Sequence, residues 1–250
     1  MKKIRIAFLI PMTSNGREWK SIEDSYFYQF FLRTLIGTTN SKYLYRIYLV
    51  VDFDDKLFSN ANFKNLEILE NLFNIYIIKI INNSVDKGHL TKLWNMAFKK
   101  AYIDGCEYFY QCGDDIQFLS FGWLDKSIKV LNENKQIGIT GPIDLKRHVT
   151  KKSFQPGGAE FLQTQTFVSR KHMDIFGYYF PEELKNWFCD NWITKIYYPD
   201  YFYKIDYFIL NKGGKERYKI CGSFDVDDPV KEKCEILINK GKEKLTEFIK

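Results

Sequence analysis

The chain has 250 residues, of which 45% are hydrophobic and 27% charged, and its formal net charge is +6. This composition is typical of a folded globular domain and excludes a disordered chain. The positive charge is modest and dispersed, unlike the basic stripe of a nucleic-acid-binding protein. No apolar run reaches the roughly 18 to 20 residues that a membrane helix needs. We therefore expect no nucleic-acid partner and no integral membrane segment.

The cysteines and the N-terminal residues indicate the cellular compartment. The five cysteines are scattered and have no C-x-x-C spacing, which argues against a disulfide framework or a zinc site. The apolar run that follows Lys3 is interrupted by Arg5 and has no small-residue cleavage site after it, so it predicts a strand and not a signal peptide. We expect a cytoplasmic protein.

Apolar runs and helical periodicities alternate along the first 140 residues. This alternation predicts an α/β fold with a mostly parallel central sheet and helices on both faces. The predicted elements, in chain order, are strand Ile4–Pro11, a helix between Ser21 and Gly37, strand Tyr45–Asp52, helix Phe63–Asn74, strand Ile75–Ile81, helix Leu90–Ile103, strand Tyr108–Cys112, helix Phe121–Asn132 and strand Ile137–Thr140.

The pattern changes after Pro142. The polar stretch Arg147–Gly158 predicts a mobile loop, and Ala159–Ser169 alternates loosely as a strand. Near the end of the chain, Pro229–Ile249 predicts an amphipathic helix that Asp228 caps.

Two acidic clusters directly follow predicted strands. Asp52, Asp54 and Asp55 come after one strand, and Asp114 and Asp115 come after another. Ligands of parallel sheets bind at the carboxyl ends of the strands, so these side chains are expected to converge on one edge.

The type of residue indicates a chemistry for each cluster. Adjacent carboxylates such as Asp114 and Asp115 repel one another, and Mg2+ or Mn2+ shared with substrate phosphates would neutralise them. Asp52 could accept hydrogen bonds from a nucleoside base or ribose. The alternative for Asp114 and Asp115 is that they start a turn. The alternative for Asp54 and Asp55 is that they form a polar turn that closes an edge of the sheet.

Two further segments contain residues that could take part in binding or catalysis. In Lys87–Asn95, Gly88 allows a tight entry to a helix whose N-terminus would attract phosphate. In Trp187–Trp192, Asp190 lies at a predicted helix start and could act as a general base, with tryptophan faces on which sugars stack. The alternative for this segment is a helix-capping aspartate among core tryptophans.

Together these residues resemble the GT-A glycosyltransferases, in particular the family 2-like group. Tyr108–Asp115 resembles the strand that leads to the metal-binding "DxD" element of that family. Phe176–Tyr179 and Asn186–Ile193 resemble its acceptor region, and the resemblance extends over roughly residues 4 to 200. It implies a nucleotide-sugar domain over 1–205, followed by an extension over 206–250 that packs on the same domain.

The resemblance also implies an activity and a set of roles. The expected reaction is metal-dependent transfer of a sugar, from a UDP-sugar above all, to a hydroxyl of a glycan or other acceptor, with inversion at the anomeric carbon. The implied site residues are Pro11, Asp52, Lys92 and Asp114 for the donor, Asp115 for Mn2+ or Mg2+, Asp190 as the base, and Trp187 and Trp192 for the acceptor.

The sequence departs from the family pattern at two motifs. Gly113-Asp114-Asp115 lacks the first acid of the triplet, and Cys189 stands where the family often has Glu. No histidine follows His172 to act as a C-terminal metal ligand; Asp225, Asp227 or Asp228 would have to replace it. Two other functions remain open, a nucleotidyltransferase that makes a nucleotide sugar and a non-catalytic glycan-binding module on the same scaffold.

Overall fold

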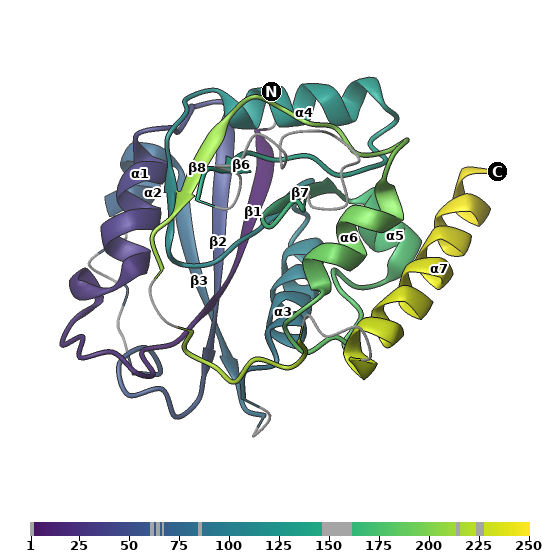
Figure 1. Ribbon diagram of the computed structural model, residues 1–250. Helices are drawn as coiled ribbons and strands as arrows, with labels where there is room; N and C mark the ends of the chain where they lie inside the picture. Colours follow the sequence, from purple (N-terminus) through teal and green to yellow (C-terminus); the bar gives the residue numbers. More distant parts are fainter. Residues whose placement is uncertain are drawn as a thin grey trace.

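The centre of the molecule is a five-stranded sheet with the strand order β3-β2-β1-β4-β7 (Figure 1). Four strands are parallel, and β7 runs antiparallel to β4. The strands are β1 (Ile4–Met12), β2 (Tyr43–Asp52), β3 (Ile75–Asn82), β4 (Tyr108–Gln111) and β7 (Thr166–Ser169). The mostly parallel sheet that the sequence predicts is therefore confirmed.

This computed structural model describes most of the chain. The described residues are 3–60, 63, 66, 68–84, 87–146, 162–213, 216–223 and 228–250. The predicted loop Arg147–Gly158 and the start of the predicted strand Ala159–Ser169 lie outside them.

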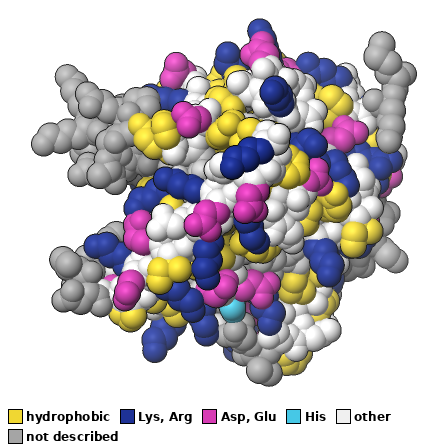
Figure 2. Space-filling model, turned by 90° about the vertical axis from the view of Figure 1, so that its right-hand side faces the viewer, with side chains coloured by type: hydrophobic (Ala, Val, Ile, Leu, Met, Phe, Trp, Pro, Cys, Tyr) yellow, Lys and Arg dark blue, Asp and Glu magenta, His cyan; other side chains and the backbone are white. Residues whose placement is uncertain are grey.

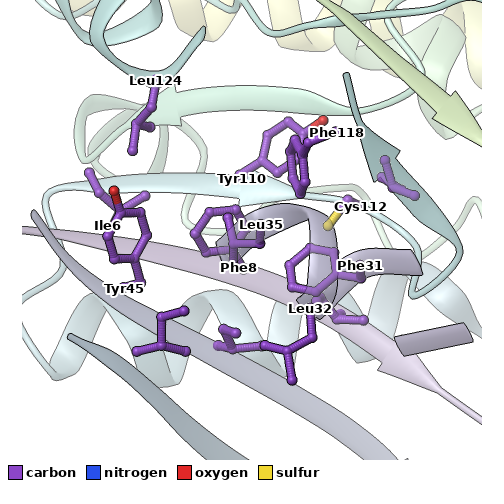
Figure 3. Packing of buried hydrophobic residues seen from close by; sticks show 14 of the residues in the cluster. Ile6, Phe8, Phe31, Leu32, Leu35, Tyr45, Tyr110, Cys112, Phe118 and Leu124 are labelled. Carbon is purple, nitrogen blue, oxygen red and sulfur yellow. The ribbon is translucent and has the colours of Figure 1, made fainter. Parts of the chain in front are cut away.

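Alternate residues of the strands point to opposite faces of the sheet, and both faces carry apolar side chains. Helices therefore cover both faces. On one face, Phe8 of β1 packs edge-on against Phe31 and Tyr110, with ring centroids 5.6 and 5.9 Å apart (Figure 3). On the other face, Ala7 and Leu9 belong to a second buried cluster. The helices are α1 (Arg33–Ile36), α2 (Ile68–Phe73), α3 (Leu90–Ile103), α4 (Trp123–Glu133), α5 (Lys171–Phe176), α6 (Cys189–Tyr197) and α7 (Pro229–Ile249).

The predicted helix between Ser21 and Gly37 is not one regular helix. It consists of a 3-10 turn at Ile22–Asp24, a π-helical stretch at Phe27–Leu32 and the short α1. The π stretch stacks the rings of Phe27 and Phe31, with centroids 5.7 Å apart, and buries both against the sheet. Tertiary packing of aromatic side chains therefore overrides the regular 3.6-residue period here.

The predicted strand Ile137–Thr140 is also wrong. The structure has only isolated bridges there, from Ile139 to Phe202 and from Thr140 to Phe167. Gly138 and Gly141 on either side adopt φ values of 125° and 144°, which L side chains rarely adopt, and this backbone interrupts a regular ladder.

A second sheet, with the order β5-β8-β6, connects the C-terminal part of the chain to the strand-end acids. It contains β5 (Ile116–Phe118), β6 (Ile143–Asp144) and β8 (Phe208–Asn211). These strands have two to four residues, too few for a period to be recognised in the sequence. Because β8 pairs with β5, the following segment is carried back toward Asp115, whose carbonyl accepts from the Lys212 amide at 2.8 Å.

The last helix begins and ends as predicted. The Asp228 carboxylate accepts from the Val230 and Lys231 amides at 2.7 and 3.2 Å, and α7 then packs on α5 and α6. Among the helices in the described part of the chain, none is both long and apolar enough to span a membrane. Figure 2 shows a face on which basic and acidic side chains are interspersed.

Candidate functional site

A cavity of about 1110 Å3 lies where the loops after β1, β2 and β4 meet the start of α6. Asp52, Asp115 and Asp190 come from three separate segments and all line it. The predicted convergence of strand-end acids on one edge is therefore confirmed. Of the predicted site residues, the cavity brings together Pro11, Asp52, Asp114, Asp115, Trp187 and Asp190.

Two predicted site residues lie elsewhere. Trp192 is fully buried and its Nε1 donates to the Leu237 carbonyl of α7 at 3.1 Å, so it belongs to the core and cannot stack on an acceptor. Lys92 does not line the cavity, and its Nζ lies 3.3 Å from the Ser84 hydroxyl. Lys87, five residues earlier, does line the cavity. The sequence places Trp192 and Lys92 on the correct helices but does not give the direction of their side chains.

Asp52 is fixed by a neighbour that the sequence reasoning missed. The Asn82 side-chain amide donates to its Oδ1 at 2.7 Å, and the two residues face each other across the parallel pair β2–β3. Asn82 is itself buried and accepts from the Ser84 amide at 3.1 Å. This contact sets the orientation of the Asp52 carboxylate at the cavity wall.

Asp55 connects the loop after β1 to the loop after β2. One oxygen accepts from the Ser14 amide at 2.7 Å and the Thr13 hydroxyl at 3.0 Å. The other accepts from the Ser14 hydroxyl at 2.8 Å and from the Leu57 and Phe58 amides at 3.1 and 2.8 Å. Burial raises the pKa of Asp55, but these donors outweigh it and the net shift is downward. Its role is structural.

Arg217 pairs with Asp114 and is the main site residue that the sequence reasoning missed. The Asp114 carboxylate is fully buried, and both of its oxygens accept from this guanidinium, one of them at 2.8 Å. The same guanidinium donates to the Thr13 carbonyl at 3.0 Å. Burial lowers the pKa of Arg217 and the Asp114 charge raises it, and the net shift is upward. The two residues are 103 positions apart, so no local pattern indicates the pair.

Of the two adjacent acids Asp114 and Asp115, Arg217 donates hydrogen bonds only to Asp114. Burial and, next, the Asp114 charge raise the pKa of Asp115 to about 6. A Cβ on Gly113 would lie 2.5 Å from its Oδ1, so any other residue at position 113 would require this carboxylate to move. Within the described residues, no three His, Cys, Asp or Glu side chains form a ready-made metal cage. The residues fit a divalent cation that one carboxylate and substrate phosphates would hold together, a common arrangement for Mg2+.

Asp190 lies in the first turn of α6, where the helix dipole stabilises a negative charge. Phe188, at φ 66°, turns the chain into this helix. Asn186 holds the approach in place, because its side-chain amide donates at 3.0 Å to the carbonyls of both Gly88 and Lys219. The start of α6, the entry to α3 and the segment 216–219 are thereby fixed around one cavity.

Comparisons with known proteins identify the fold. No protein-family model matches the sequence, and no curated protein matches it. Among solved structures, S. aureus TarS 1-349 in complex with UDP superposes with a TM-score of 0.59 at 17% identity, covering 95% of this chain and 65% of that one. A second S. aureus TarS structure gives a TM-score of 0.56 at 16% identity, covering 86% of this chain and 38% of that one.

These similarities show the fold and, at such identities, nothing more. The chain has the GT-A, Rossmann-like fold that the sequence resemblance predicts. It spans less than two thirds of the length of the S. aureus TarS chains that it matches.

Proposed function

We propose that this protein is a glycosyltransferase that moves a sugar from a UDP-sugar to an acceptor hydroxyl, with inversion at the anomeric carbon. The observation that carries the proposal is the meeting of Asp52, Asp115 and Asp190 in one cavity. The UDP present in the structure of the TarS neighbour supports a uridine nucleotide as the donor.

Each acid has a separate task in this proposal. Asp52, oriented by Asn82, accepts hydrogen bonds from the nucleoside. Asp115 would hold Mn2+ or Mg2+ against the diphosphate, and such a cation stabilises the negative charge that develops on the leaving group.

Asp190 acts at the opposite end of the reaction as the general base. It takes the proton of the acceptor hydroxyl while the hydroxyl oxygen bonds to the anomeric carbon and the bond from that carbon to the diphosphate breaks. The start of α6 and Trp187, which both line the cavity, form the acceptor side. Attack from the face opposite the leaving group inverts the configuration.

The test is to separate donor binding from turnover. We expect the wild-type protein to bind UDP-glucose or UDP-N-acetylglucosamine with Mn2+ in titration calorimetry and to release UDP when a glycan acceptor is added. Asp190→Asn should retain donor affinity within about twofold and lose UDP release by about 100-fold or more, as expected when a general base is removed. Asp115→Asn should lose the dependence of binding on Mn2+.

The alternatives give different results in the same assays. A glycan-binding module would bind sugars without regard to nucleotide or metal. A nucleotidyltransferase would release pyrophosphate from a nucleoside triphosphate. Undiminished UDP release by Asp190→Asn would remove Asp190 from the mechanism.

A further inference from the structure

Three uncharged polar side chains line the same cavity as Asp115 and Asp190 and form part of its wall. They are Gln111, at the end of β4, and Thr164 and Gln165, just before β7, and each is at most 7% exposed. Gln111 faces Thr166 across the β4–β7 pair, so Gln165 lies beside Gln111 at the carboxyl edge of the sheet.

The position of this wall relative to Asp190 follows from α6. The Gln163 amide donates to the Thr194 hydroxyl at 3.1 Å, and Asp190 lies one helical turn before Thr194 on the same face of the helix. The segment that contains Thr164 and Gln165 therefore passes next to the base. On its other side, Gln111 is four residues from Asp115. The wall thus occupies the place between the diphosphate end and the acceptor end of the cavity.

The two glutamines present hydrogen-bond donors to the cavity. The Gln111 Oε1 accepts from the Thr166 hydroxyl at 3.3 Å, and the Gln165 Oε1 accepts from the Thr164 hydroxyl at 2.6 Å. With each oxygen engaged by the protein, the Nε2 groups are left to donate to a ligand, and no partner within the described residues takes them. Side-chain amides of this kind recognise hydroxyl or carbonyl oxygens.

Charge selects among the sugars that carry such oxygens. None of the three wall residues is charged, and the carboxylate of Asp190 lies at one end of the wall. A sugar carboxylate placed here would be partly desolvated beside a like charge, which costs binding free energy. The cationic side chains of the described lining belong to other loops: Arg17, Lys20, Lys56, Lys87, Arg217 and Lys219.

We infer that Gln111 and Gln165 form the subsite for the transferred sugar, and that this subsite takes an uncharged hexose-type sugar and rejects a uronic acid. The inference rests on the proposed function, because it assumes that the nucleotide and the acceptor occupy the two ends of the cavity.

The experiment is titration calorimetry in Mn2+ with UDP, UDP-glucose, UDP-galactose, UDP-N-acetylglucosamine and UDP-glucuronate as probes. At least one neutral donor should bind more tightly than UDP, and UDP-glucuronate should not. The double variant Gln111→Leu/Gln165→Leu should weaken the preferred neutral donor by about tenfold or more, since each lost hydrogen bond is worth roughly a factor of three to ten, and leave UDP affinity within about twofold. Gln165→Arg should improve UDP-glucuronate relative to the neutral donor by about tenfold.

A matched control variant, together with the melting temperature of each variant, separates an effect on binding from an effect on folding. Gln117→Leu changes a glutamine of β5 that does not line the cavity and should leave all five affinities unchanged. Tighter binding of UDP-glucuronate than of UDP by the wild type overturns the inference, as does an equal loss of UDP and neutral-donor affinity in the double variant. Binding of UDP with no gain from any neutral sugar overturns the subsite and leaves nucleotide binding intact. If no probe binds, the proposed function itself fails and the inference fails with it.

Discussion

The buried pair of Asp114 and Arg217 gives the sharpest test of how this site is built. Arg217→Met keeps much of the length and apolar stem of the side chain and removes the guanidinium. The Asp114 carboxylate would then lose both of its charged hydrogen bonds while it stays fully buried. Leaving a buried charge without its partner costs about 3 to 5 kcal/mol of the free energy of unfolding. For a chain of this length, each kcal/mol lowers the melting temperature by about 2 to 4 °C.

A double-mutant cycle isolates the charge from the loss of packing. Asp114→Asn in the Arg217→Met background removes the uncompensated charge, so we expect the double variant to recover at least about 2 kcal/mol relative to Arg217→Met alone. The measurement is urea unfolding followed by circular dichroism at pH 7 without added nucleotide or metal. Lys129→Met is the control, because the Lys129–Glu133 pair is exposed at 3.8 Å and such pairs contribute about 1 kcal/mol or less. A loss below about 1 kcal/mol for Arg217→Met, or no recovery in the double variant, would refute the reasoning.

Three further changes test other parts of the structure. Asp55→Asn turns an amide toward donors of Ser14 or Phe58 and should lower the free energy of unfolding, measured in urea, by about 1 to 3 kcal/mol. The Ser14 amide should also exchange its hydrogen faster, and an unchanged exchange rate would contradict the proposal that Asp55 holds the two loops together. Burial lowers the pKa of His172 from 6.5 to about 4, so the unfolded chain takes up this proton first and the contribution of His172 to the free energy of unfolding should fall by about 3 kcal/mol between pH 6.5 and 4. His172→Gln should flatten that decline, and an identical slope in the variant would argue against it. Asp228→Ala removes the cap of α7 and should lower the free energy of unfolding by about 1 kcal/mol, measured by thermal melting; an unchanged melting temperature would dismiss the cap as a contributor.

The parallel sheet could be predicted because its strands are buried on both faces and appear in the sequence as apolar runs. The same rule places Asp52 and Asp115 at one edge, since the loops after parallel strands lie on the same side of a sheet. The GT-A resemblance adds the start of α6. These inferences depend only on strand direction and order.

What could not be predicted depends on side-chain direction and long-range pairing. Asp190 and Trp192 are two positions apart on α6, which is about 200° around the helix, so one faces the cavity and the other the core under α7. Arg217 reaches Asp114 only because the short strand β8 returns the chain to β5. No periodicity extends over such short strands, and no spacing rule connects residues 103 positions apart.

The acids of the cavity differ in how the protein compensates their charge, and this difference separates structural from ligand-facing residues. Asp55 is satisfied by five hydrogen bonds and Asp114 by a buried guanidinium, so a ligand would have to displace existing partners to bind either one. A donor group at Asp114, the role that the family resemblance implies, must therefore compete with Arg217. Within the described part of the chain no side chain makes such hydrogen bonds to Asp115, and burial and, next, the Asp114 charge raise its pKa. Under the proposed function, a divalent cation held together with the donor diphosphate would therefore displace the fewest existing partners at Asp115.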